Sequence, residues 1–129
     1  MRILDTDHCI DILRGRTQVI ERRSQVFDEV ATTIVTACEL YYGAAKSVRP
    51  LENKRLVDQF LSTLRVLELS PRAAQFFGVL KANLEALGKG LADADLLIGS
   101  IARANRAVVV TGNTRHFDRM EGVELENWR

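Results

Sequence analysis

Short runs of apolar residues alternate along the chain with longer stretches in which apolar residues recur every three or four positions. The short runs are typical of buried β-strands, and the longer stretches are typical of amphipathic helices. The expected strands lie at residues 2–4, 31–35, 66–69, 107–111 and 123–126. The expected helices run from Asp7 to Gly15 and over residues 17–29, 36–46, 51–64, 70–87 and 93–105. The pattern therefore predicts strands and helices in alternation along the chain.

This alternation predicts an α/β fold, in which a central, mainly parallel sheet of four to five strands lies between two layers of helices. The chain has two prolines, Pro50 and Pro71, and no internal repeat or low-complexity stretch. Residues 1–129 are thus expected to form a single domain, long enough to bury a substantial core. Ligands of such sheets bind beyond the carboxyl ends of the strands, so the functional residues are sought there.

Composition narrows the classes of protein to consider. Hydrophobic residues make up 47% of the 129 residues and charged residues 27%, as in soluble globular domains. No apolar run approaches the roughly 20 residues that span a bilayer, and the first residues lack the apolar segment of a signal peptide, so a cytoplasmic location is expected. Cys9 and Cys38 form no metal-binding motif, which disfavours zinc, and both are expected to be small apolar fillers. The net charge of +1 does not decide for or against nucleic acid, because local patches steer such binding.

Acidic and polar residues stand at the predicted strand ends. They are Asp5 and Asp7 after the first strand, Glu39 one turn into the next helix, Asp93 and Asp95 at a helix start, and Asn113 after the fourth strand. Clustered carboxylates repel one another and resist burial, and a divalent cation removes that penalty. Oxygen ligands without histidine or cysteine favour Mg²⁺ or Mn²⁺. Such an ion lowers the pKa of a bound water and polarises a phosphoryl oxygen, which indicates hydrolysis of a phosphodiester.

Most of these acids also have an ordinary structural interpretation. Asp7 and Asp93 stand where helix N-caps are expected, and Asp95 suits the first turn of a helix dipole. Residues 36–39 match the capping-box pattern that ends in Glu39. Asp5 has weaker structural reasons for its place directly after a buried strand. Spacing and periodicity by themselves therefore predict a metal-binding α/β domain and leave the choice of ligands open.

Four motifs in order along the chain resemble those of PIN-domain ribonucleases, especially the VapC-type toxins of bacterial toxin–antitoxin pairs. Residues 3–7, Ile-Leu-Asp-Thr-Asp, are similar to the LDTN opening of that family, with Asp7 in place of the usual Asn. Residues 36–43 are similar to its E-L-x-x-G motif, and residues 95–99 to its D-L-L-I-A motif, with Gly99 in place of Ala. Residues 110–117 are similar to V-T-x-N-x-x-x-F, and the ending through Trp128 also matches many members. The resemblance thus covers essentially the whole chain.

The resemblance implies a PIN-like three-layer fold and an endoribonuclease that uses Mg²⁺ or Mn²⁺ to cut RNA, often tRNA or ribosomal RNA. It implies that Asp5 and Asp95 are the main metal ligands and that Glu39 completes the acidic cluster, directly or through water. It also implies a homodimer, silenced by a cognate antitoxin that lies across the same groove as RNA. Asn113 stands where some relatives have Asp, and His116 where an acid is frequent, which favours one metal ion over two.

Basic residues near the groove would grip RNA phosphates, although each also fits a solvated charged face. The candidates are Arg14, Arg16, Arg22, Arg23, Arg115 and Arg119. Trp128 is expected to be a packed anchor.

Two other functions fit parts of the sequence. Residues 5–7 satisfy the D-x-D opening of haloacid-dehalogenase-type phosphatases, in which the first aspartate is a phosphoryl nucleophile, but the four lysines include none after a predicted strand. A PIN-like scaffold that binds RNA or a protein without cutting is the second alternative, and the presence of Asp5, Glu39 and Asp95 disfavours it.

Overall fold

A computed structural model describes residues 1–129 of the chain. Five strands form one parallel sheet in the order β3-β2-β1-β4-β5, which confirms the predicted α/β fold with a central sheet. The strands are β1 (Arg2–Leu4), β2 (Val30–Thr33), β3 (Arg65–Leu67), β4 (Val108–Val110) and β5 (Glu124–Glu126). The helices are α1 (Thr6–Leu13), α2 (Thr17–Gln25), α3 (Ile34–Ala45), α4 (Pro50–Leu61), α5 (Pro71–Ala86), α6 (Asp93–Ala104) and α7 (Thr114–Phe117). None of these helices combines the length and the apolar character that a membrane-spanning segment requires.

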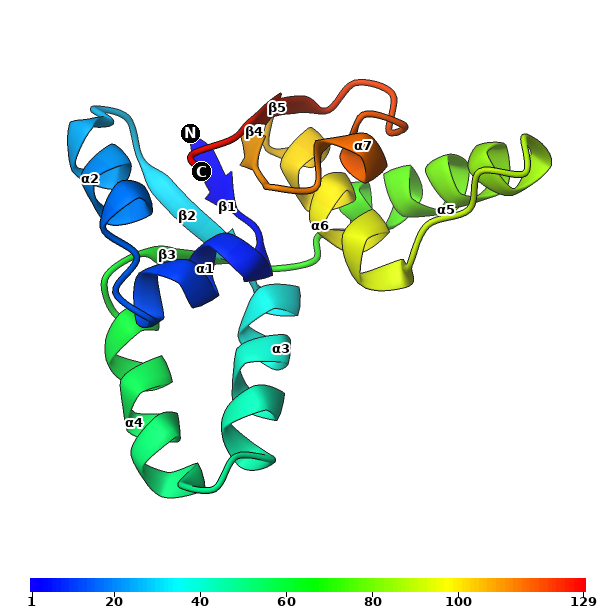
Figure 1. The fold of residues 1–129 in the computed structure, drawn as a ribbon. Coiled ribbons are helices and arrows are strands. Elements are labelled where there is room, and N and C mark those ends of the chain that lie inside the picture. The colour runs from blue at the N-terminus through cyan, green and yellow to red at the C-terminus, as the bar shows by residue number, and fades with distance from the viewer.

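The alternation of side chains along the strands divides the core into two layers. Ile3 and Val109 are register partners in β1 and β4, and both face a cluster formed with α5 and α6. Their neighbours Leu4 and Val110 face the opposite side, where α1 to α4 supply the apolar partners. Successive residues of a strand point to opposite faces, so two short apolar strands are enough to build both layers. Figure 1 shows the two pairs α3–α4 and α5–α6 projecting as separate arms from the sheet.

Several element boundaries differ from the expectation. The β-branched residues Ile34 and Val35 were expected in the second strand, but they form the first turn of α3. The reason is Thr33, whose side chain accepts a hydrogen bond from the backbone N–H of Thr36 at 3.2 Å and caps the helix there. The helix expected over 17–29 ends at Gln25, and Phe27 is fully exposed in the connection that follows. Capping and tertiary contacts, which residue type alone does not reveal, set both limits.

The C-terminal segment confirms two expectations. The edge strand predicted at 123–126 is present as β5, which pairs with β4. Trp128 is 3% exposed and packs in the cluster under α1 to α4, as an anchor of the chain end. The expected burial of both cysteines is confirmed for Cys9 and wrong for Cys38, which is exposed on α3.

Candidate active site

A small, polar pocket lies at the carboxyl ends of β1, β2 and β4. Its volume is about 100 Å³. It is lined by Asp5, Thr6, Asp7, Glu39, Asp95, Ile98, Asn113 and Phe117. The three carboxylates singled out from the sequence as metal ligands thus meet at one place, although β1, α3 and α6 carry them from distant parts of the chain. The helices α1 and α3 directly follow β1 and β2, which places Asp5 and Glu39 at this edge of the sheet. The helix α6 follows α5, and it brings Asp95 to the same pocket from the segment before β4.

Asp5 begins the site at the end of β1. It is 5% exposed, and its backbone is extended before α1 starts. Its Oδ1 atom accepts the backbone N–H of His8 at 2.9 Å, which makes Asp5 the N-cap of α1. The interpretation of Asp7 as the cap of this helix is therefore wrong, and Asp5, which was expected to have only weak structural reasons for its place, is the cap. Asp7 lies in the first turn, is exposed, and lines the pocket.

Glu39 reaches the pocket from the sixth position of α3. The N-cap of that helix is Thr33, so the capping-box interpretation of residues 36–39 is wrong and Glu39 is free for another role. Its Oε1 atom accepts a hydrogen bond from Thr6 Oγ1 at 2.5 Å, and the Thr6 hydroxyl lies 3.1 Å from that of Thr36. Thr6 therefore ties the start of α1 to Glu39. Sequence reasoning missed this role, because Thr6 belongs to the first motif and its partner Glu39 lies 33 residues away along the chain.

Asp95 is the most electrostatically perturbed acid of the pocket. Burial raises its pKa, nearby His116 opposes that rise, and the carboxylates of Glu39 and Asp5, with Asp7, raise it further. The result is a pKa above the ordinary value for aspartate. A carboxylate is held among other carboxylates at a cost unless a cation joins them. The clustered carboxylates therefore favour the binding of a cation.

Asn113 and His116 stand where some relatives have further acidic residues. The side-chain nitrogen of Asn113 lies 2.7 Å from Nδ1 of His116, and the same Nδ1 is 3.8 Å from an oxygen of Asp95. Asn113 also lines the pocket, where its amide supplies a neutral polar group. These two positions thus add no carboxylate to the three of Asp5, Glu39 and Asp95.

Asp93 is turned away from the pocket. It is the first residue of α6, whose N-cap is Ala92, so the predicted cap at Asp93 is wrong. Its carboxylate forms an exposed ion pair with Lys81 at 2.9 Å. Asp95, two residues on, faces the pocket, since successive positions of a helix point in different directions.

The donor set fits a hard divalent cation. All ionisable groups lining the pocket are carboxylates, and hydroxyl and amide oxygens complete it. As the side chains stand, no group of three or more Asp, Glu, His or Cys has the geometry to hold one ion. Mg²⁺ needs one or two direct carboxylates and keeps several waters, so three simultaneous contacts are not required of the chain.

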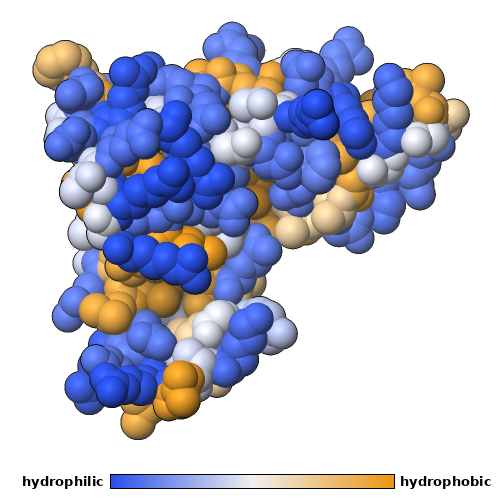
Figure 2. All heavy atoms as spheres, viewed as in Figure 1, coloured by the Kyte–Doolittle hydropathy of each residue, from blue (hydrophilic) through white to orange (hydrophobic).

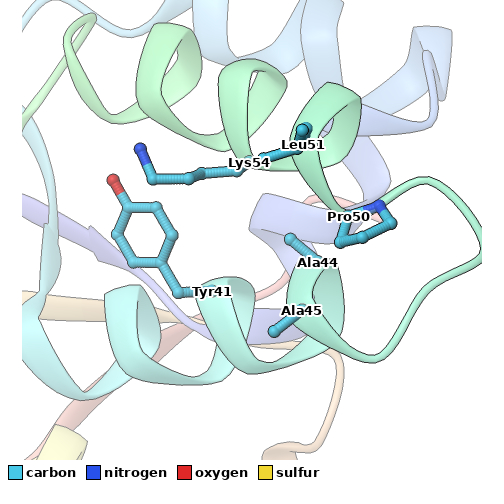
Figure 3. A pocket seen from close by; sticks show the side chains of 6 residues that line it. All are labelled: Tyr41, Ala44, Ala45, Pro50, Leu51 and Lys54. Atoms are coloured by element: carbon cyan, nitrogen blue, oxygen red, sulfur yellow. The ribbon is translucent and has the colours of Figure 1, made fainter.

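A larger hollow lies elsewhere, between α3 and α4. Its volume is about 470 Å³, and it is lined by Tyr41, Ala44, Ala45, Pro50, Leu51 and Lys54 (Figure 3). The side chains are mostly apolar, and no carboxylate lines this hollow. The volume of a cavity therefore does not indicate the active site of this chain, because the smaller pocket holds the carboxylates.

The six arginines expected to bind phosphate fall into two groups. Arg16 pairs with Asp11, Arg22 pairs with Glu126, and Arg23 bonds to Thr63, so these three have partners within the chain. The other three, Arg14, Arg115 and Arg119, form no ion pair. These are the arginines left to meet an external anion.

One basic residue was missed by the sequence analysis. The Nε atom of Arg129 donates to Asp11 at 2.8 Å, and its guanidinium lies against Gly112 at the end of β4. The hydrogen bond to Asp11 raises the pKa of Arg129, and the charges of Asp7 and Asp5 raise it further. The tertiary structure brings Arg129 close to Asp5, Asp7 and Asp11, and no local sequence pattern indicates this.

Comparison with known proteins places the chain among similar sequences and structures. The profile of the PIN domain matches residues 2–123. The chain is 35% identical over 127 residues to Ribonuclease VapC2 of Haemophilus influenzae, which covers 98% of this chain and 96% of that protein. It is 34% identical, with the same coverage, to the tRNA(fMet)-specific endonuclease VapC of Salmonella typhimurium. In the crystal structure of VapBC2 from Rickettsia felis bound to a promoter DNA fragment, one chain matches with a TM-score of 0.94 and 30% identity, covering 99% of this chain and 98% of that one.

Proposed function

This chain belongs to the PIN-domain family, as a ribonuclease toxin of the VapC type, and from that premise we propose that it cleaves RNA with a Mg²⁺ or Mn²⁺ ion held by Asp5, Glu39 and Asp95. The observation that carries the proposal is the convergence of these three carboxylates on one pocket, where burial and the charges of Glu39 and Asp5 raise the pKa of Asp95. When bound, the cation supplies Lewis acidity and a water of lowered pKa.

The chain's own residues prepare the site for that ion. Asp5 is fixed by its capping bond, and Glu39 is fixed by the Thr6 hydroxyl, so two ligands are oriented before any cation arrives. Asp95 is half-buried, which limits the water that competes for it. Preorganised ligands lose little freedom on binding, which favours the ion and the in-line geometry of phosphodiester cleavage.

The same arrangement supports the nuclease over the phosphatase. A dehalogenase-type phosphatase needs a lysine beside its nucleophilic aspartate, and no lysine lines the pocket. The intact acidic set likewise supports catalysis over a scaffold that only binds RNA.

The experiment that tests the proposal compares three aspartate variants on an RNA substrate, with Mn²⁺ and with EDTA. Asp5→Asn and Asp95→Asn are expected to abolish cleavage. Asp93→Asn is the matched control, because Asp93 lies on the same helix as Asp95 but outside the pocket, in an exposed ion pair that contributes little to stability. Cleavage in EDTA, or full activity of Asp5→Asn, would overturn the mechanism. Trapping of an aspartyl-phosphate from a phosphomonoester would support the phosphatase instead.

We further propose that the substrate is a tRNA and that the chain acts in the cytoplasm. Two relatives, from Salmonella typhimurium at 34% identity and from Shigella flexneri at 32%, are named tRNA(fMet)-specific endonucleases. Incubation with purified initiator tRNA, elongator methionine tRNA and ribosomal RNA tests this. Cleavage confined to the initiator tRNA is the expected result, and preference for ribosomal RNA would refute it.

The partners proposed for the chain are a second copy and an antitoxin. Support for an antitoxin comes from the relatives crystallised as VapBC complexes. Apolar side chains gather on the arm formed by α3 and α4 (Figure 2), where Val48, Leu51 and Leu56 are exposed. Such a surface suits a protein contact. Light scattering is expected to give the mass of a dimer. If a small reading frame adjoins the gene of this chain, co-expression with its product is expected to yield an inactive complex.

Residues 1–129 are proposed to form one PIN domain. The profile match ends at residue 123, and β5 continues beyond it as the edge of the same sheet. A single calorimetric unfolding transition is expected, and two separate transitions would contradict it.

A further inference from the structure

A buried histidine lies directly behind the acidic pocket. His8 stands in the first turn of α1 and is 0% exposed. Its ring is held between Asp5 on one side and the backbone of Trp128 on the other. The position is polar at both ends within an apolar layer formed by Leu4, Cys9 and Trp128.

The two partners decide which ring nitrogen carries the proton. Nε2 lies 3.3 Å from the backbone nitrogen of Trp128, which always donates, so Nε2 must accept and cannot carry a hydrogen. Nδ1 lies 3.2 Å from Oδ1 of Asp5, which accepts, so Nδ1 must donate. In the other neutral tautomer, Nε2–H would face the backbone N–H of Trp128, and the lone pair of Nδ1 would face the carboxylate of Asp5. The bonding pattern therefore selects the neutral ring protonated at Nδ1.

The same contacts fix the two oxygens of Asp5 in different roles. Oδ1 accepts two hydrogen bonds, one from the backbone N–H of His8 and one from its ring. Oδ2 makes no hydrogen bond, and since no buried side-chain polar atom of the chain lacks a partner, Oδ2 is in contact with solvent. Asp5 lines the pocket, so its free oxygen is the one available to a ligand there. A neutral histidine also leaves the negative charge of Asp5 uncancelled.

We propose that His8 is a positioning residue for cation binding: its Nδ1–H holds Oδ1 of Asp5 inward and presents Oδ2 to the pocket, and the backbone of Trp128 sets the tautomer that makes this possible. The inference rests on the proposed role of Asp5 as a metal ligand. It also gives the segment around Trp128 a function beyond packing. Partners that orient a ligand in this way typically change metal affinity by about 10- to 100-fold when they are removed.

Two substitutions separate positioning from packing. His8→Asn places an amide N–H near the Nδ1 position and loses the acceptor for Trp128. His8→Gln places an amide oxygen near the Nε2 position, keeps an acceptor for Trp128, and loses the donor to Asp5. Each variant removes one of the two ring hydrogen bonds from the same buried place, so their costs in stability are expected to be similar.

The measurement is Mn²⁺ affinity by titration calorimetry on wild type and both variants, with unfolding curves to establish that each is folded. His8→Gln is expected to weaken Mn²⁺ binding by about 10- to 100-fold, and His8→Asn is expected to retain most of the affinity. In addition, ¹H–¹⁵N correlations of the His8 ring in the metal-free wild type are expected to show protonation at Nδ1. This spectrum reports on the inference even if a variant fails to fold.

The outcomes distinguish this inference from the proposed function. Equal affinities for the two variants, or a ring protonated at Nε2, would overturn the positioning role of His8 while leaving Asp5 as a ligand. Absence of Mn²⁺ binding by the wild type would overturn the proposed metal site itself, and the tautomer spectrum would still decide the hydrogen-bond arrangement.

Discussion

Gly99 lies in the third motif, at a position where the family pattern has alanine, and the structure predicts that an alanine there would clash with the side chain of Met120. The residue is buried in the middle of α6, four positions after Asp95. A Cβ atom at Gly99 would lie 2.1 Å from the sulfur of Met120 and 3.2 Å from its terminal methyl. Met120 is 2% exposed, so its side chain has little room to withdraw. Glycine at 99 and methionine at 120 therefore form a complementary pair.

Two opposing effects set the size of the expected change. Alanine in place of glycine inside a helix contributes about 1 kcal/mol of stability through backbone entropy and helix propensity. Overpacking of a core costs about 1–3 kcal/mol. Gly99→Ala is thus expected to change the free energy of unfolding by between zero and a loss of about 2 kcal/mol. In a Met120→Ala background the clash is gone, and the same substitution is expected to stabilise by about 1 kcal/mol.

Urea unfolding of wild type, the two single variants and the double variant measures this coupling. Gly78→Ala in α5 is the matched control, because a Cβ there meets nothing within 4 Å and the substitution should stabilise the chain in both backgrounds. If Gly99→Ala stabilises wild type as much as it stabilises the Met120→Ala protein, the packing argument is refuted. A coupled result would show that Met120, in the segment after α7, limits the size of the side chain that α6 accepts at position 99.

Three further predictions concern two residues of the site and the two cysteines. In the metal-free protein, the pKa of Asp95 is raised, so its contribution to stability is present below the pKa of the unfolded carboxyl and is lost as pH rises through the folded value. Asp95→Asn should therefore raise the Tm in EDTA at neutral pH. The difference in Tm between the variant and wild type should shrink toward about pH 4. A lower Tm for Asp95→Asn at neutral pH would contradict the sign. Thr6→Val, which removes the hydroxyl that holds Glu39, should lower Mn²⁺ affinity by about 10-fold, whereas Thr6→Ser should not; equal losses would indicate a packing effect. Burial raises the pKa of Cys9 to about 12, so a thiol reagent should label Cys38 at once and Cys9 after unfolding, and rapid labelling of two thiols would contradict the structure.

Much of the fold follows from local pattern. The strand at residues 2–4 and the valine-rich strand β4 are short apolar runs, and runs of this kind fit buried parallel strands whichever neighbours they pair with. The start of α5 was equally clear, because Ser70 caps the helix and Pro71 occupies its first position. Boundaries were less predictable: Ile34 and Val35 have the residue types of a strand, but the Thr33 side chain starts a helix in front of them.

The candidate site was predictable in its residue types but not in its internal order. Sequence reasoning placed Asp5, Glu39 and Asp95 together and could not separate Asp7 from Asp93, since both acids stand at helix starts. In the structure Asp7 lines the pocket, whereas Asp93 forms an exposed ion pair with Lys81 from α5.

The sequence by itself determined the alternation of strands and helices, the family to which the chain belongs, and the acidic chemistry at the strand ends. These properties are carried by local periodicity and by residue types at fixed spacing. The tertiary structure alone decided how the acids are held: the Thr6 hydroxyl on Glu39, and the His8 ring between Asp5 and Trp128, whose partners lie 33 and 120 residues apart. Hydrogen bonds across such separations depend on where the sheet brings the chain together, and no local pattern encodes that.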